Sequence, residues 1–244
     1  MQGANAAEIP RSLAETSSRR RAALVVNDVQ FCAAIGVACA LLSLAGCGGD
    51  RPPVIPPPVV THIFSNPRFD GDIEQISAGS FIVTQGMSPT VQSVLAGTGQ
   101  TEFRAFLNFP LGGSGGVPFN AFIDSAFLEL FVDNLIPING SVPIRVELVT
   151  FQPPTLIGTD FLRSALPPLG AVLVNGNVTG ADVGWFVPVD VTSLMIQVQQ
   201  RGLIDFQVRI MEDLGPASFT LMVIDDRTTP DRAQFAPLLT VTYH

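Results

Sequence analysis

Apolar residues alternate with charged or polar residues in two stretches of the chain, residues 144–148 and 205–210. In the first stretch, Ile144, Val146 and Leu148 alternate with Arg145 and Glu147. A repeat of two places successive side chains on opposite faces of a β-strand. Both stretches are therefore predicted to be half-buried strands, with the core on one face and the charged side chains on the other.

Other stretches are apolar at nearly every position and are bounded by Gly, Pro, Asn or Asp. Such stretches are typical of central strands, which are covered on both faces. They comprise residues 103–109, 126–132, 219–224 and 238–243. Six of the sixteen phenylalanines beyond residue 60 fall within these runs, and the core between two sheets is the expected place for their rings.

One segment follows a helical repeat instead. Asp190, a residue type that caps helix N-termini, precedes apolar residues at positions 191, 194, 195 and 198, and Gly202 supplies a stop. This spacing predicts a short helix that crosses one end of the fold. The predicted fold class is thus all-β, an antiparallel β-sandwich with one short helix.

The N-terminal part has the layout of a secretory signal. Three arginines at positions 19–21 precede a charge-free apolar run from Phe31 to Gly46, and the run is followed by Cys47. The sequence Leu-Ala-Gly-Cys that ends at Cys47 resembles the lipobox of bacterial lipoproteins. The resemblance implies cleavage before Cys47 and a thioether-linked lipid on its thiol.

Two features of this signal leave alternatives open. The first feature is the length of the apolar run: its sixteen residues can just span a bilayer of about 30 Å, so an uncleaved signal anchor is an alternative to a cleaved signal. In addition, about thirty residues precede the run. This length favours a translation start downstream of Met1 over a degenerate twin-arginine signal.

The chain after Cys47 begins with a Pro-rich stretch, which predicts an extended polyproline II spacer of about 3.1 Å per residue. The predicted organisation is a signal peptide over residues 1–46, a tether over 47–61 and one β-sandwich domain over 62–244. Localisation follows from the lipobox: the protein is expected to be secreted and held on the bacterial cell envelope by lipidated Cys47. By analogy with other lipoproteins, Gly48 suggests the outer membrane of a diderm.

Composition excludes several classes of function. All 13 basic residues are arginine, so a P-loop, a Schiff base or a lysine general base is excluded. The net charge of −8 and the scattered arginines argue against binding of nucleic acid, which needs clustered positive charge. Histidine occurs only at His62 and His244, so no hydrolytic triad is expected. All three cysteines lie within the first 47 residues, which leaves no thiol for the predicted domain.

The order of several short motifs resembles that of the DNRLRE domain family. The motifs are Phe69-Asp70-Gly71-Asp72, TEFRAFLNFPL (101–111), IDSAFLELFVDN (123–134), IRVELVTF (144–151), GWFVPVDVTSLM (184–195), GLIDFQVRI (202–210) and PLLTVTYH (237–244). This resemblance, which covers most of the chain beyond the tether, implies a jelly-roll-like β-sandwich related to carbohydrate-binding modules on bacterial surface and secreted proteins. It implies the fold more strongly than it implies sugar binding, because function belongs to a site rather than to a fold.

Acidic residues offer two interpretations. Asp70 and Asp72 are candidate ligands for calcium, a hard cation that takes several oxygen ligands from loops. Turn-forming, solvated carboxylates are the other interpretation, and it applies equally to the acidic residues between positions 225 and 231.

Candidates for a ligand-binding surface are few. Sugar-binding modules usually stack Trp or Tyr rings on pyranose faces, but Trp185 and Tyr243 are expected to be core residues. A glycan site would then use polar groups such as Arg104, Asn108 or Asp133, or phenylalanines on the outer face of a strand, for which Phe127 and Phe131 are the candidates.

The sequence therefore predicts a non-catalytic binding or structural module of the cell envelope, anchored to the membrane through its lipid. One alternative is recognition of an extracellular polysaccharide. Another is a self-associating or adhesin-like component that assembles with an envelope protein, for which an exposed apolar strand face would be the sign.

Overall fold

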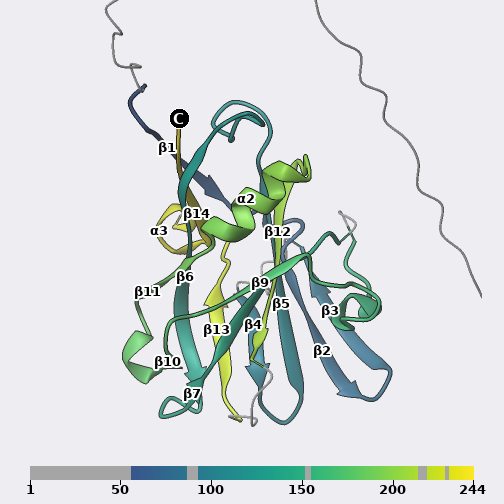
Figure 1. Ribbon diagram of the computed structural model, residues 1–244. Coiled ribbons are helices and arrows are strands. Elements are labelled where there is room, and N and C mark those ends of the chain that lie inside the picture. The colour runs from purple at the N-terminus through teal and green to yellow at the C-terminus, as the bar shows by residue number, and fades with distance from the viewer. Residues whose placement is uncertain (1–55, 87–92, 152–154, 214–218, 229–230) are drawn as a thin grey trace, which may run out of the picture. The chain divides into compact units, whose positions relative to one another are not determined.

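The chain folds into antiparallel β-strands whose sheet curls over on itself, as the computed structural model shows (Figure 1). The structure describes residues 56–86, 93–151, 155–213, 219–228 and 231–244, and Cys47 and the predicted signal lie outside them. These residues belong to one compact unit, Pro56–His244. The predicted all-β, jelly-roll-like sandwich is confirmed.

Within the described ranges, twelve strands form the curled sheet, and two short strands form a separate pair. The strands of the main sheet are β1 (Val59–Phe64), β2 (Gly71–Ser77), β3 (Ser80–Gln85), β4 (Ser93–Thr98), β5 (Glu102–Pro110), β6 (Ile123–Ile136), β8 (Ile144–Leu148), β9 (Gly170–Leu173), β11 (Phe186–Asp190), β12 (Asp205–Glu212), β13 (Leu221–Asp225) and β14 (Leu238–Tyr243). The separate pair is β7 (Ser141–Val142) and β10 (Val178–Thr179).

The long strand β6 links the two layers of the sandwich. Its first half pairs with β14 and its second half with β13, while β11 pairs along its other edge. Strands β11, β6, β14 and β1 form one layer. From β13 the sheet continues through β4, β5, β12, β8 and β9, with β2 and β3 attached to β5, and so forms the other layer.

The main core lies between these layers. It is filled by alternate residues of the central strands, such as Leu128 and Leu130 of β6, Leu107 of β5 and Val208 of β12. The strand Val59–Phe64 begins three residues before the expected domain boundary, because Val59 to Thr61 pair with the last strand, β14.

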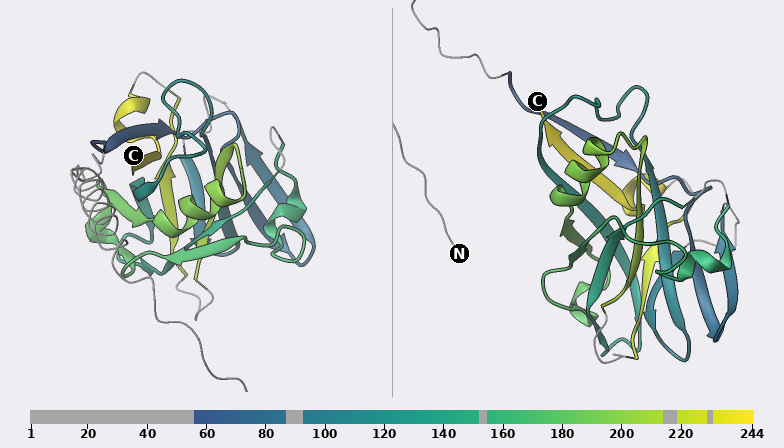
Figure 2. Two further views of the ribbon diagram at one scale, coloured as in Figure 1. Left: turned by 45° about the horizontal axis from the view of Figure 1, so that its top comes forward. Right: turned by 45° about the vertical axis from the view of Figure 1, so that its right-hand side comes forward.

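The predicted helix is α2 (Thr192–Gln200), which lies in front of the strands (Figures 1 and 2). Leu194, Met195 and Val198 are buried in the main core, as their spacing predicted. Val191 rather than Asp190 occupies the N-cap position, but the Asp190 carboxylate still accepts a hydrogen bond of 2.9 Å from the Thr192 amide. The other helical segments are α3 (Arg232–Phe235) and the 3-10 turns η1 (Gly158–Phe161) and η2 (Gly180–Asp182).

The prediction that β8 and β12 are half-buried is wrong. Glu147 of β8 and Arg209 of β12 are fully buried, because part of the segment between β8 and β9 folds over the outer face of these strands. Phe151, Leu156 and Phe161 of that segment form a second core with Ile73 and Phe106.

A buried ion pair crosses the second core. Arg209 Nη2 lies 2.5 Å from Glu147 Oε2, and Arg163 approaches the other carboxylate oxygen at 2.9 Å. Arg209 also donates to the Asp160 carbonyl oxygen at 2.9 Å, which fixes η1 to the strand. Burying such charges is costly unless each is paired and hydrogen-bonded. Glu147 Oε2 accepts hydrogen bonds from Arg209, whereas Glu147 Oε1 is held by the ion pair with Arg163 alone.

Removing one partner of this pair is expected to destabilise the domain strongly. Arg209→Met leaves the Glu147 carboxylate buried beside Arg163 alone, and breaking buried pairs of this kind typically costs about 3–5 kcal/mol. Urea denaturation measures the loss, with the exposed Arg201→Met as the matched control. A double variant, Arg209→Met with Glu147→Met, is expected to recover much of the lost stability. An unchanged midpoint for Arg209→Met would contradict this account.

Candidate functional site

The outer surface of the β11–β6–β14–β1 layer carries aromatic side chains. Residues alternate along β6, so that Phe127, Glu129 and Phe131 point outward while their neighbours enter the core. This alternation confirms the expectation that Phe127 and Phe131 lie on the outer face of a strand. We call this surface the aromatic face.

Strand pairing continues the aromatic face to both sides of β6. Directly paired residues of neighbouring strands share a face of the sheet. On β11, Phe186 pairs with Phe131 and Pro188 with Glu129. On the other side, the outward residues are Leu238 and Thr240 of β14 and Phe64 and His62 of β1.

Three of the rings form a row in mutual contact. The ring centroid of Phe131 lies 5.3 Å from that of Phe186 and 4.7 Å from that of Phe235, which α3 supplies. Adjacent rings are inclined by 70° and 61°, so that a ring edge meets a ring face. The guanidinium of Arg227 lies 4.6 Å from the Phe235 centroid and extends the row with a cation–π contact.

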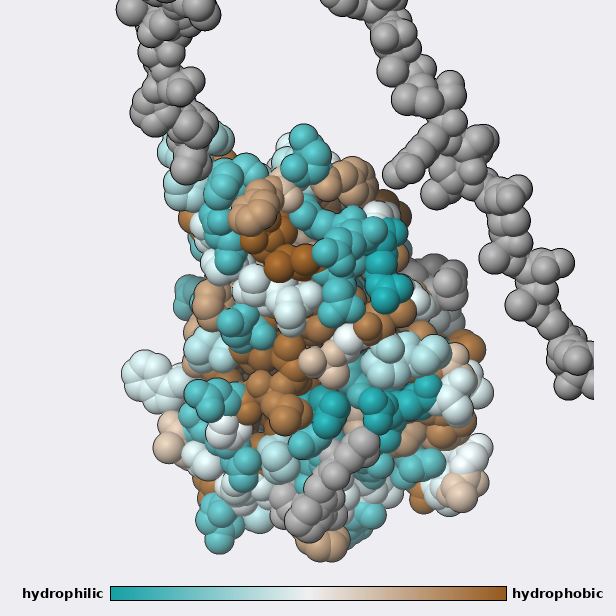
Figure 3. All heavy atoms as spheres, viewed as in Figure 1, coloured by the Kyte–Doolittle hydropathy of each residue, from teal (hydrophilic) through white to brown (hydrophobic). Residues whose placement is uncertain are grey.

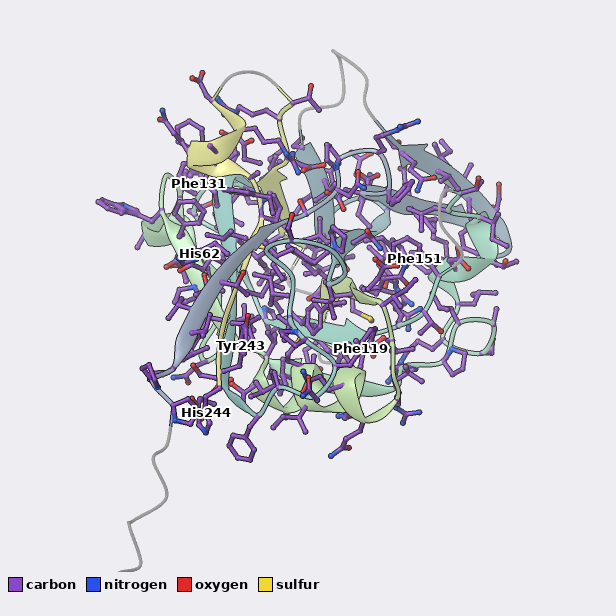
Figure 4. All side chains as sticks on the ribbon, turned by 90° about the horizontal axis from the view of Figure 1, so that it is seen from above. His62, Phe119, Phe131, Phe151, Tyr243 and His244 are labelled. Atoms are coloured by element: carbon purple, nitrogen blue, oxygen red, sulfur yellow. The ribbon has the colours of Figure 1, made fainter. Side chains whose placement is uncertain are left out.

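Polar groups border this row. Arg227 donates to the Asp225 carboxylate and lies 3.8 Å from Asp133 Oδ1. Farther along the face, His62 Nδ1 lies 3.0 Å from Thr240 Oγ1. Figure 4 shows Phe131 and His62 on the same side of the domain, opposite the second-core residue Phe151.

Trp185 is exposed, and the prediction that it is a core residue is wrong. It immediately precedes β11 at the margin of the aromatic face, and 71% of its surface is accessible to solvent. Its backbone carbonyl accepts a hydrogen bond from Val132, so the main chain is held by β6 while the indole stays in solvent. Tyr243, by contrast, packs against the main core as predicted.

Other predicted residues divide between surface and interior. Arg104 and Asn108 are buried, so neither can contact a ligand on the aromatic face, whereas Asp133 is half exposed. Six phenylalanines of the described part of the chain are exposed, which corrects the expectation that these rings fill the core. They are Phe64, Phe119, Phe122, Phe127, Phe186 and Phe219.

Asp70 and Asp72 lie in separate environments. The carboxylate of Asp70 accepts a 2.8 Å hydrogen bond from the Asn108 amide and faces Arg232, whose Nη2 is 3.8 Å away. Burial raises the pKa of Asp70 well above its usual value, and the negative charge of Asp226 raises it further. Asp226 is also buried and pairs with Arg232 at 2.7 Å, so the interpretation of these acids as solvated turn residues is wrong.

Asp72 faces β4, where its carboxylate accepts a 3.3 Å hydrogen bond from the Leu95 amide. Burial raises the pKa of Asp72 to about 7, although the Leu95 hydrogen bond acts in the opposite direction. Within the described residues, no three His, Cys, Asp or Glu side chains are grouped so that they could hold a metal ion. Calcium at Asp70 or Asp72 therefore stays a prediction, and calcium at Asp70 would have to displace the Arg232 guanidinium.

A second apolar area is visible in Figure 3, where hydrophobic side chains gather below α2. Partly buried valines such as Val172, Val183 and Val187 pack against the main core. We interpret this area as the margin of the core. Among the described residues, no helix is long and apolar enough to cross a membrane.

Comparison of the sequence with models of protein families and with curated proteins found no match. The aromatic face is therefore the observation from which a function can be argued.

The raised pKa of Asp72 predicts a domain that loses stability as the pH rises. Its folded pKa of about 7 exceeds the ordinary value of 3.8, so the folded state holds a proton that the unfolded state releases. The free energy of unfolding contributed by this group is fully present below pH 4 and is lost as the pH rises towards 7. Asp72→Asn stays neutral throughout, so at pH 8 it should be more stable than the wild type by up to roughly 4 kcal/mol.

Denaturant titrations between pH 4 and pH 8 measure this difference. The matched control is Asp133→Asn, which removes a carboxylate that is half exposed instead of buried. Parallel pH curves for the wild type and Asp72→Asn would disprove the assignment.

Proposed function

We propose that this protein is a non-catalytic binding module of the bacterial cell envelope, anchored through lipidated Cys47, whose aromatic face holds polysaccharide chains. The row formed by Phe186, Phe131 and Phe235 carries this proposal. Phe186 is exposed, whereas Phe131 and Phe235 are half-buried, so the row presents a partly open apolar surface, and such surfaces commonly mark binding sites.

The chemistry of the face suits a glycan. Pyranose rings present C–H groups on their faces, and these meet the negative face of an aromatic ring favourably. Trp185, the residue before Phe186, is the most exposed of the large apolar side chains that the structure describes. Arg227 and Asp133 supply donors and acceptors for sugar hydroxyls at the border of the row.

The non-catalytic part of the proposal rests on the sequence. It contains no lysine, and its two histidines are at positions 62 and 244. Among the described residues, His62 is in hydrogen-bonding contact with Thr240 and His244 contacts Asp124 at 3.0 Å, and neither pair includes the third member of a nucleophile–base–acid triad. The DNRLRE-type resemblance supports the same class of module.

Self-association is a second candidate function, favoured by strand β3. Among the described residues β3 pairs only with β2, so its other edge is unpaired. The strand also carries the exposed apolar side chains of Ile82 and Val83. An apolar edge strand can pair with a second copy of the same chain.

Polysaccharide binding is expected to change the emission of Trp185, the only tryptophan of the chain. We expect a bound glycan to shift the Trp185 emission to shorter wavelength. We expect Phe186→Asn to weaken glycan binding about tenfold, because the loss of one ring contact of about 1.4 kcal/mol corresponds to a tenfold change in affinity. Titration of the purified protein with a panel of soluble polysaccharides measures both effects.

Phe219→Asn is the matched control, since Phe219 is as exposed as Trp185 but lies outside the aromatic face, and its positive φ of 49° is one that Asn tolerates. Equal weakening by both variants would overturn the site. Absence of binding, together with an oligomeric state that grows with concentration, would favour the second candidate function.

Lipidation predicts that membrane attachment depends on Cys47. In the bacterial host, the wild-type protein should sediment with membranes and partition into the detergent phase, because its acyl chains bury in the bilayer. Cys47→Ser should block processing at the lipobox, and mass spectrometry of the mature N-terminus would show an acylated cysteine only in the wild type. An unmodified Cys47 in membrane-bound protein would instead support the uncleaved signal anchor.

A further inference from the structure

Two exposed phenylalanines lie at one end of the domain, away from the aromatic row. Phe119 and Phe122 belong to the connection between β5 and β6, and 62% and 66% of their surfaces are accessible to solvent. Neither ring is needed to fill the core. The stretch from Pro110 to Ile123 also contains no charged residue.

The same end holds the start of β1. Thr61 Oγ1 donates a 2.6 Å hydrogen bond to the carbonyl oxygen of Gly115 in the β5–β6 connection. Val59, where β1 begins, pairs with Tyr243, and Phe122 exchanges backbone hydrogen bonds of 2.8 and 3.1 Å with His244.

The ribbon views place these parts together. In Figure 1 and in the right-hand view of Figure 2, the start of β1, the C-terminus and the β5–β6 connection lie at the same end. Figure 4 looks onto this end, with Phe119 and His244 on it. The Phe122 ring stacks on the His244 imidazole with centroids 5.3 Å apart, which holds the ring at the surface. We call this surface the tether end.

We infer that the tether end lies on the lipid bilayer, with Phe119 and Phe122 in its headgroup region. The inference rests on the proposed lipid anchor. Cys47 precedes Val59 by twelve positions, and twelve residues span at most about 40 Å even when fully extended. A lipid on Cys47 therefore keeps the tether end close to the membrane.

Because the domain is tethered, even a weak contact between the two rings and the bilayer is enough to keep the tether end on the membrane. Two aromatic rings bind a bilayer only weakly from solution, but a short tether turns this into an intramolecular event at high effective concentration. Aromatic rings favour the interfacial layer of a bilayer. The stretch from Pro110 to Ile123 is uncharged, which suits the same layer, and the Asp124 carboxylate that follows it is in contact with His244 at 3.0 Å.

This orientation has a consequence for the aromatic face. Strand β6 begins beside the tether end at Ile123 and runs away from it, so Phe131 lies farther along the strand than Phe127. The row of rings would therefore stand clear of the bilayer. Contact with the membrane and binding of a polysaccharide would use different surfaces and could occur together.

The test uses the full-length protein, lipidated in its bacterial host and reconstituted into vesicles of phosphatidylethanolamine and phosphatidylglycerol. An environment-sensitive fluorophore is attached at Ser114→Cys in the β5–β6 connection. In a control preparation it is attached at Ala78→Cys, an exposed position in the turn between β2 and β3, at the far end of the domain (Figure 1). Flotation with the vesicles reports the anchor separately.

We expect spin-labelled lipids to quench the fluorophore at position 114 at least threefold more than at position 78. Phe119→Ser combined with Phe122→Ser should abolish this difference while flotation is unchanged. Equal quenching at both positions, or quenching at 114 that survives the double variant, would overturn the membrane contact and leave the anchor standing. Loss of flotation in the unsubstituted protein would overturn both. A blue shift at 114 that needs no lipid and grows with protein concentration would identify a second copy as the occupant.

Discussion

The buried ion pair between Glu147 and Arg209 determines which faces of the sandwich remain available. Because neither charge reaches solvent, the pair requires cover, and residues of the segment between β8 and β9 supply it by placing Phe161 and its neighbours over the strands. Arg209 and Arg104 both donate to backbone carbonyls of η1, so the cover is attached by hydrogen bonds as well as by apolar packing. The outer face of β5, β8 and β12 is thereby closed by the chain itself.

With that face closed, the exposed aromatic residues that the structure describes, apart from Phe219, lie in two other places. The aromatic face lies on the β11–β6–β14–β1 layer, and the tether end lies where β1 begins. The first combines rings in contact with arginine and carboxylate groups at its border, whereas the second combines two rings with an uncharged connection. This difference in chemistry is why we assign a hydroxyl-rich polymer to the first surface and a lipid bilayer to the second.

Local patterns predicted the elements well. The alternation over residues 144–148 coincides with β8, the spacing of Leu194, Met195 and Val198 with α2, and the apolar runs with central strands. The candidate site was predicted only in part: Phe127 and Phe131 were identified, but Trp185 and Phe186 were not. An aromatic residue in the sequence can lie in a core or on an exposed face, so the exposure of Trp185 and Phe186 could not be deduced from residue type.

The sequence by itself determined where strands and the helix form, since side-chain periodicity is a property of neighbouring residues. The absence of lysine and the presence of two histidines, also read from the sequence, underlie the expectation of a non-catalytic module. Only the tertiary structure decided that Glu147 and Arg209 are buried and that Trp185 is exposed. Burial depends on which distant segment covers a residue. For Glu147 and Arg209 that segment lies after β8, and for Trp185 no described segment closes over the indole.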